Sequence, residues 1–265
     1  MKKMKKGIIL SALAGCLLAT GCGRSSEKAD GFTSRVDLEG YEYDCIVELP
    51  DSLVTDGEGG KYVRFRGQGM LPSQVGGKKI ASVRDSLMRL GGISMADRTG
   101  ALPLLKEGYR LTRLDPEKIS GCSERYNQLA VTLVTPRIVV WRDYVYSYLC
   151  GSAHGLYNTT YVNYSIPDGK ILELTDIFKK GYEKELLSLI VERLKEDEVE
   201  LSVKPEEVGI PSDFEIIESG IRFVWGLYEI APYVEGEVTV DIATYEITDL
   251  LKPGVEEMLY GRTDN

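Results

Sequence analysis

His154 is the only histidine of this 265-residue chain, and it lies between two glycines, Gly151 and Gly155. A Ser-His-Asp triad would have to use it, yet Ser152 would point to the opposite side of an extended segment. No serine stands in a Gly-x-Ser-x-Gly elbow, and no His-Glu-x-x-His zinc motif is present. The spacing therefore predicts a tight bend in which His154 has a structural role, with contact to a ligand or partner as the second interpretation.

A second group of candidate residues is the aromatic run at residues 228–236. Tyr228, Pro232 and Tyr233 suit an exposed loop that contacts sugar or protein, and equally suit a core, because tyrosine fits both settings. Glu229 lies among these rings and is the candidate acid if the chain is an enzyme. Both interpretations of this loop stay open at the level of sequence.

Other candidate chemistry is weaker. Asp168, Glu173 and Asp176 occupy positions typical of a turn, a strand and a helix cap, and these roles already explain them. Residues 67–69 read Gly-Gln-Gly but lack the lysine and the helix start of a phosphate-binding loop. We therefore expect no cofactor and no metal.

The N-terminus predicts a lipid anchor. A basic start is followed by an apolar run at residues 8–19, which is too short to span a bilayer but typical of a signal peptide. The segment ending at Cys22 resembles the lipobox of bacterial lipoproteins, whose cysteine thiol receives a diacylglyceryl group before cleavage. A second match ends at Cys16, but it would leave a very short apolar core.

We therefore expect residues 1–21 to be a signal peptide and Cys22 to be lipidated, which makes the membrane a partner through the lipid. Residues 22–34 would form a polar tether reaching at most about 40 Å. Gly23 stands where some bacterial lipoproteins carry an inner-membrane retention aspartate, which favours the outer membrane.

Charge and cysteine content narrow the possible partners. The chain carries a net charge of −9, and loss of residues 1–21 would leave 28 basic against 41 acidic side chains, a net charge of −13. An acidic body argues against nucleic acid and is compatible with a basic protein partner. Cys45, Cys122 and Cys150 remain after Cys22, and in an oxidising envelope two of them can pair, in any of three combinations.

Hydrophobic periodicity predicts an α+β protein of two mixed units, built on largely antiparallel sheets with a few packed helices. The expected units cover residues 35–140 and 141–258, followed by a tail at 259–265. The expected strands are residues 37–49, 61–66, 128–135, 137–149, 156–166, 171–174, 214–217, 221–227 and 237–242. The expected helices are residues 79–90, 183–194 and 244–251, and residues 67–77, 95–120 and 196–207 are expected to be loops or irregular.

The order of motifs resembles a known extracellular module. Residues 148–155 read Tyr-Leu-Cys-Gly-Ser-Ala-His-Gly, residues 168–178 read Asp-Gly-Lys-Ile-Leu-Glu-Leu-Thr-Asp-Ile-Phe, and residues 228–236 read Tyr-Glu-Ile-Ala-Pro-Tyr-Val-Glu-Gly. This pattern is similar to the domain shared by RsiV-type anti-sigma factors and the non-catalytic part of PdaC-type peptidoglycan deacetylases. The stretch from 35 to 135 resembles, more weakly, the smaller domain that precedes it. Cys150 and Ser152 depart from the pattern, where glycine is more usual.

The resemblance implies a fold and a binding role rather than an activity, because the sigma-binding segment and the deacetylase domain of those families have no counterpart here. RsiV-like members bind lysozyme, and peptidoglycan is the usual expectation elsewhere. We therefore expect a lipid-anchored, non-enzymatic binding or sensing module that recognises a cell-wall glycan or a lysozyme-like secreted protein. The alternatives are a carboxylate-dependent enzyme acting on peptidoglycan, and a structural lipoprotein that packs against other envelope proteins.

Overall fold

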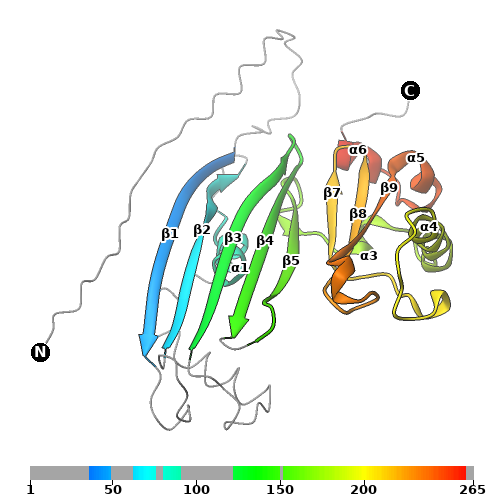
Figure 1. Cartoon of the computed structure of the whole chain (residues 1–265). Helices are drawn as coiled ribbons and strands as arrows, with labels where there is room; N and C mark the ends of the chain where they lie inside the picture. The colour runs from blue at the N-terminus through cyan, green and yellow to red at the C-terminus, as the bar shows by residue number, and fades with distance from the viewer. Residues whose placement is uncertain (1–35, 49–61, 76–79, 91–121, 150–151, 261–265) are drawn as a thin grey trace, which may run out of the picture.

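The computed structural model describes residues 36–48, 62–75, 80–90, 122–149 and 152–260 (Figure 1). The expected signal peptide, Cys22 and the tether lie outside these residues, as do Cys150, Gly151 and residues 95–120. Lipidation and the cysteine pairing therefore stay predictions. No helix within the described ranges is long and apolar enough to cross a membrane.

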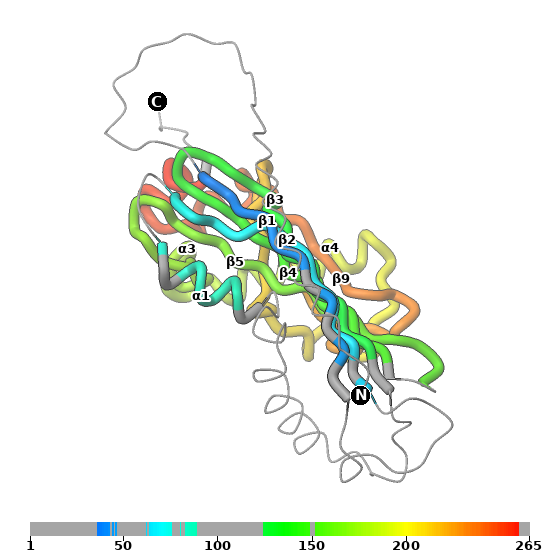
Figure 2. Tube along the Cα trace, turned by 90° about the vertical axis from the view of Figure 1, so that its left-hand side faces the viewer, coloured from blue at the N-terminus to red at the C-terminus, as the bar shows by residue number. Residues whose placement is uncertain are grey.

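A six-stranded sheet forms the larger layer, with its strands in chain order and neighbours antiparallel except for the parallel pair β2–β3. Its long strands are rich in β-branched and aromatic residues, which pack well on a pleated surface. The strands are β1 (Val36–Glu48), β2 (Tyr62–Val75), β3 (Cys122–Val134), β4 (Ile138–Leu149), β5 (Leu156–Ser165) and β6 (Lys170–Ile171). Helix α1 (Ala81–Leu90) packs on one face of this sheet (Figure 2).

A second, three-stranded antiparallel sheet lies beside β5, with helices on its far side (Figure 1). Its strands are β7 (Phe214–Ile217), β8 (Gly220–Trp225) and β9 (Val238–Ala243). The accompanying helices are α3 (Leu174–Ile177), α4 (Glu183–Glu196), α5 (Thr244–Ile247) and α6 (Val255–Tyr260), with short 3₁₀ turns η4 (Pro205–Glu207), η5 (Tyr233–Glu235) and η6 (Thr248–Leu250). Fold class α+β, with two largely antiparallel sheets, is confirmed.

Strand β4 contributes to both hydrophobic cores of the protein. Ile138 and Val140 pack into the core that includes α4 and the three-stranded sheet. Val139 and Trp141 point to the other face and pack beneath α1. Successive strand residues face opposite sides, so one strand serves two cores. The boundary expected between residues 140 and 141 falls inside β4, and the six-stranded sheet continues across it.

A buried amide helps to link the two sheets. Asn163 on β5 is 1% exposed. Its Nδ2 donates to the carbonyl oxygen of Phe214 at 2.7 Å, and its Oδ1 accepts from the backbone N–H of Ile216 at 2.8 Å. The side chain thus makes the two hydrogen bonds that a neighbouring strand would make to β7, which holds the small sheet against β5.

Several expected boundaries were wrong. The glycine-containing stretch at 67–75 is not a loop but the second half of β2, where a Cβ at Gly69 would stand 2.4 Å from the carbonyl oxygen of Leu129. Here glycine permits close approach of β2 to β3 rather than a turn. The strand expected at 171–174 is only Lys170–Ile171, and Leu174 already begins α3. The helix expected at 244–251 divides into α5 and η6, and α6 extends to Tyr260.

Candidate functional site

Two loops that are 78 residues apart in sequence meet at one end of the molecule. The ring of His154, in the β4–β5 connection, stacks on the ring of Tyr233, in the β8–β9 connection, with centroids 4.0 Å apart and planes at 27°. The Tyr233 hydroxyl donates to the carbonyl oxygen of Gly155 at 2.9 Å. Tyr228 lies against Tyr233, with ring centroids 5.7 Å apart. We call the group of His154, Gly155, Tyr228, Pro232 and Tyr233 the aromatic tip.

The strands beneath the aromatic tip fix its geometry. A Cβ on Gly155 would lie 2.4 Å from the ring of Tyr146, so only glycine lets the chain pass over that ring. Gly236, which ends the second loop, has φ +74° and passes close to the Tyr157 hydroxyl. Tyr228 itself adopts φ +64°, a strained conformation for a non-glycine residue that surrounding contacts must hold.

Carboxylates near the aromatic tip mostly support the loops. Glu229 Oε2 accepts the backbone N–H of Gly226 at 2.8 Å, closing the turn that carries Tyr228. Glu237 accepts hydrogen bonds from the backbone N–H and the hydroxyl of Thr159, which ties the second loop to β5. Burial, with smaller contributions from Glu229 and Glu237, raises the pKa of the Asp213 carboxyl.

The arrangement around His154 does not form a nucleophilic triad. Its Nδ1 lies 3.1 Å from the carbonyl oxygen of Gly155. No carboxylate or serine hydroxyl within the described ranges hydrogen-bonds to the ring. The carbonyl oxygen of Ser152 accepts the Tyr148 hydroxyl at 3.3 Å. No cluster of potential metal ligands occurs among the described residues.

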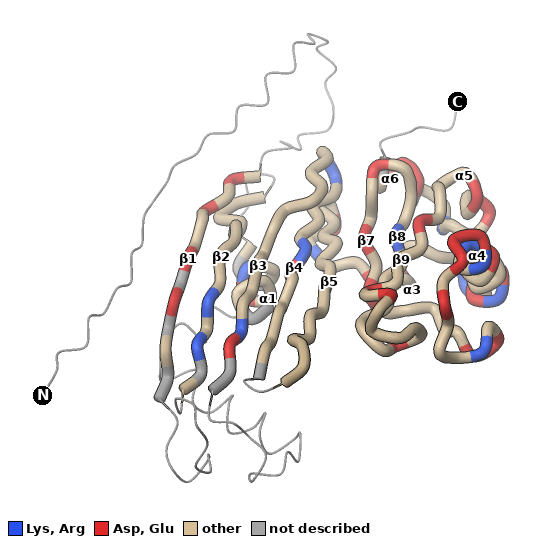
Figure 3. Tube along the Cα trace, in the orientation of Figure 1, with Lys and Arg blue, Asp and Glu red and all other residues tan. Residues whose placement is uncertain are grey.

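Part of the aromatic tip is exposed. Tyr228 is 56% exposed, and its neighbours on the two loops, Val234 and Leu156, are 82% and 51% exposed. No Asp, Glu, Lys or Arg occurs between Asp143 and Asp168. Figure 3 shows the resulting contrast, because the lower parts of β4 and β5 are free of charge whereas charged residues concentrate around α4. Exposed apolar surface of this kind marks a contact site.

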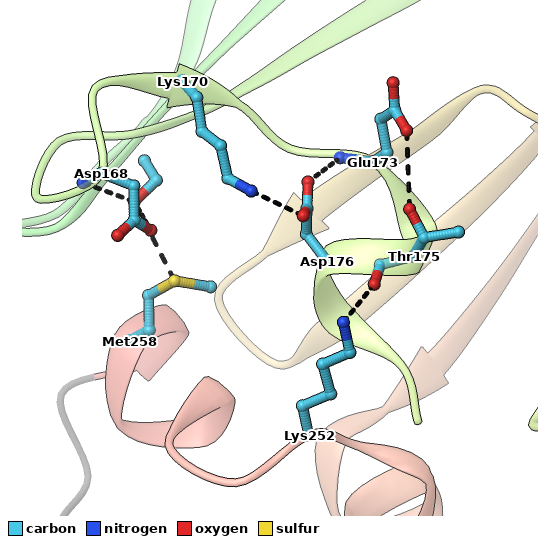
Figure 4. Close-up of polar contacts among 8 residues, drawn as sticks. Asp168, Lys170, Glu173, Thr175, Asp176, Lys252 and Met258 are labelled. Atoms are coloured by element: carbon cyan, nitrogen blue, oxygen red, sulfur yellow. Dashed lines mark hydrogen bonds and ion pairs between the residues drawn. The ribbon is translucent and has the colours of Figure 1, made fainter. Parts of the chain in front are cut away.

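The carboxylates of the 168–176 segment have structural roles (Figure 4). Asp168 Oδ2 accepts the Ser165 hydroxyl at 2.7 Å within the turn after β5. Asp176 accepts the backbone N–H of Glu173 at 3.0 Å and the Lys170 ammonium at 2.6 Å. These bonds, the one from Lys170 above all, lower the pKa of Asp176. The N-cap was expected at residue 175 or 176. The N-cap of α3 is instead Glu173, and Asp176 completes the capping box.

Most residues of the aromatic tip were candidates in the sequence, but the residues that hold its two loops in place were not. His154, Gly155, Tyr228, Glu229, Pro232 and Tyr233 come together within two loops, whereas Gly151 lies outside the described residues and Ser152 contacts Tyr148 through its carbonyl oxygen. Tyr146, Tyr157 and Glu237, which hold the loops in place, were not predicted. The available signal was the alternation of tyrosines along residues 144–148, which places three rings on one face of β4.

The fold and the two loops define an α+β protein with two sheets linked through β5 and β7 and a partly exposed aromatic tip. Residues 175–245 match the family described as "Protein of unknown function (DUF3298)". This stretch holds α4, β7, β8 and the Tyr228–Tyr233 loop, but not His154. The likeness to RsiV- and PdaC-type proteins stays a prediction.

Two solved structures share the fold. A DUF3298 family member from Bacteroides fragilis NCTC 9343 is 18% identical, with a TM-score of 0.59 over 86% of this chain and 98% of that chain. A DUF3298 family protein from Pseudomonas aeruginosa PAO1 is 15% identical, with a TM-score of 0.52 over 83% of this chain and 96% of that chain. At these identities the likeness shows the fold alone. No curated protein matches this chain.

Proposed function

We propose that this chain is a lipid-anchored, non-enzymatic binding module of the cell envelope and that its aromatic tip contacts a cell-wall glycan. The observation that carries the proposal is the stacked pair of His154 and Tyr233 beside the exposed ring of Tyr228. The apolar C–H faces of a sugar ring pack against aromatic rings, and tyrosine and histidine add polar edges for its hydroxyls.

The segment around His154 carries no Asp, Glu, Lys or Arg between Asp143 and Asp168, and this part of the surface suits a neutral glycan. Recognition of a basic protein is steered by acidic surface at the contact. Figure 3 shows acidic residues on β1, around α4 and in the loop that follows β8, whereas the lower ends of β4 and β5, next to His154, carry none.

The position of the aromatic tip suits an anchored protein. β1 begins at Val36, which pairs with Val75, whereas Leu156 pairs with Ser147 at the opposite end of the sheet (Figure 1). The 13 residues of β1 span roughly 40 Å. A lipid at Cys22 would hold the Val36 end near the membrane, and the aromatic tip would point away from it toward the wall.

The test is sedimentation of the mature protein with insoluble peptidoglycan. Tyr228→Ala should reduce the bound fraction several-fold, because it removes the most exposed ring of the aromatic tip. Tyr245→Ala is the matched control, since Tyr245 is 81% exposed on α5 and lies outside the two loops, and it should bind like the wild type. Equal binding by both variants would contradict the proposal. Tyr228-dependent binding of a lysozyme-like protein, with no binding of peptidoglycan, would replace the glycan by a protein partner.

A second candidate function is a carboxylate-dependent enzyme acting on peptidoglycan. The observation in its favour is the exposed Glu229, the candidate acid, which lies beside Tyr228 and, with Glu237, adds to the burial that raises the pKa of the nearby Asp213 carboxyl. Incubation with peptidoglycan should then release reducing ends, and Glu229→Gln should abolish the release. No release from the wild type retires this candidate and leaves the binding module.

A further inference from the structure

A cleft opens on the face of β4 and β5 opposite the aromatic tip. It has a volume of about 630 Å³ and lies beside α1. Arg125, Asp143, Asn158 and Thr160 supply its polar groups, and Val162 and Ile171 supply apolar surface. This volume and this mixture of apolar walls with a few polar groups are typical of small-molecule sites.

Asp143, in the wall of the cleft, carries an unsatisfied polar atom. The residue is 2% exposed, and its Oδ1 has no hydrogen-bond partner in the described part of the chain. On the same face of β4, the buried indole N–H of Trp141 also lacks a partner. Buried polar atoms are nearly always paired, and an unpaired one costs free energy until a ligand or a water fills the position.

Arg125 places a donor beside this acceptor. Its Nε donates to the side-chain oxygen of Asn127 at 3.2 Å, and its two terminal nitrogens bind no residue that the structure describes. Across the cleft, Asn158 Nδ2 donates to the Thr160 hydroxyl at 3.2 Å, which orients both side chains. The cleft therefore presents an open guanidinium edge and an ordered amide–hydroxyl pair, with the unpaired carboxyl oxygen of Asp143 buried in its wall.

We propose that this cleft binds a neutral polyhydroxylated ligand of one or two sugar rings, with Asp143 and Arg125 contacting neighbouring hydroxyls. A hydroxyl both donates and accepts, so two adjacent hydroxyls satisfy a carboxyl oxygen and a guanidinium edge together. The apolar side chains of Val162 and Ile171 suit the C–H face of a ring. The site is separate from the aromatic tip and does not depend on the function proposed for it.

The protonation state of Asp143 decides whether this residue favours a ligand with hydroxyl groups or a zwitterion with an ammonium group. Burial raises the pKa of this carboxyl to about 7, against the opposing effects of Asn127 and Arg125. An ammonium group of an amino acid would pair only with the ionised form. A hydroxyl fits both forms, because it can donate to the carboxylate and accept from the acid.

Titration calorimetry of the mature protein tests the proposal, with N-acetylglucosamine, N,N′-diacetylchitobiose and maltose as probes and L-alanine as the zwitterion. At least one saccharide should saturate a single site, and Arg125→Gln and Asp143→Ala should each weaken it about tenfold or more. Tyr228→Ala should leave this affinity unchanged, which separates the cleft from the aromatic tip. Thr160→Ala, on the cleft surface, gives a milder second variant if either substitution impairs folding.

Three results would overturn the proposal. The first is the absence of saturable saccharide binding at millimolar concentration. The second is binding that Tyr228→Ala abolishes and Arg125→Gln leaves intact. The third is saturable binding of L-alanine alone, which would assign the cleft to amino acids.

Discussion

Removal of the Asn163 side-chain amide tests how the two sheets are held together. Asn163→Ala would leave the carbonyl of Phe214 and the N–H of Ile216 buried without their partner. Each unsatisfied group costs about 1–3 kcal/mol, so the free energy of unfolding should fall by about 2–6 kcal/mol. That is a large part of the 5–15 kcal/mol typical of a folded domain.

The assay is urea unfolding followed by tryptophan fluorescence, with thermal unfolding as a second measurement. At about 2–4 °C per kcal/mol for a chain of this size, the Tm of Asn163→Ala should drop by roughly 5–20 °C. Asn158→Ala is the matched control, because Asn158 is exposed on the same strand and its side-chain amide donates to Thr160, also on β5. It should stay within about 0.5 kcal/mol of the wild type. If Asn163→Ala were as stable as Asn158→Ala, the amide would not be the link between β5 and β7.

Three further predictions follow from the same structure. Because the pKa of Asp143 is raised from 3.8 to about 7, the folded state binds its proton more tightly than the unfolded state, and the wild type should lose stability as pH rises from about 4 to 7. Asp143→Asn removes this loss. In urea unfolding, the free energy of unfolding of the variant should therefore exceed that of the wild type only slightly at pH 4 and by up to about 4 kcal/mol above pH 7. Parallel pH profiles of the two proteins would contradict the assignment. Gly155→Ala should displace the β4–β5 connection and weaken peptidoglycan sedimentation, since its Cβ would stand 2.4 Å from a tyrosine ring, whereas Gly209→Ala, with nothing within 4 Å, should bind normally. Because β4 serves both cores, the fluorescence transitions of Trp141 and Trp225, isolated by replacing the other with Phe, should coincide, and separate midpoints would show that the cores unfold independently.

Elements with strong local signals could be predicted closely from sequence. The apolar stripe of α4 and the short buried run of β7 are set by periodicity within the segment, and their predicted bounds lie within two residues of those observed. The second half of β2 could not be predicted, because Gly67 and Gly69 have the composition of a loop. Only the approach of β3 shows why glycine is needed there.

Each of the two loops of the candidate site could be predicted from the sequence, but the contact between them could not. The sequences around His154 and Tyr233 each indicated a special loop, but their contact depends on β7 lying beside β5, a long-range arrangement that no local pattern encodes. Asp143 gave no sequence signal, since a single polar residue in a strand usually faces solvent. Its burial results from the way the sheet and its neighbours pack, and that burial makes it a candidate ligand group.

The most direct test of the aromatic tip uses the fact that His154 is the only histidine of the chain. Its imidazole C–H resonances can therefore be followed without assignment of the rest of the protein by NMR. On titration with soluble peptidoglycan fragments, these resonances should shift progressively to saturation in the wild type and in Tyr245→Ala, and should shift little in Tyr228→Ala. Resonances that stay unchanged while the fragments bind would show that the glycan is recognised elsewhere, and would contradict the assignment of the aromatic tip as the binding site.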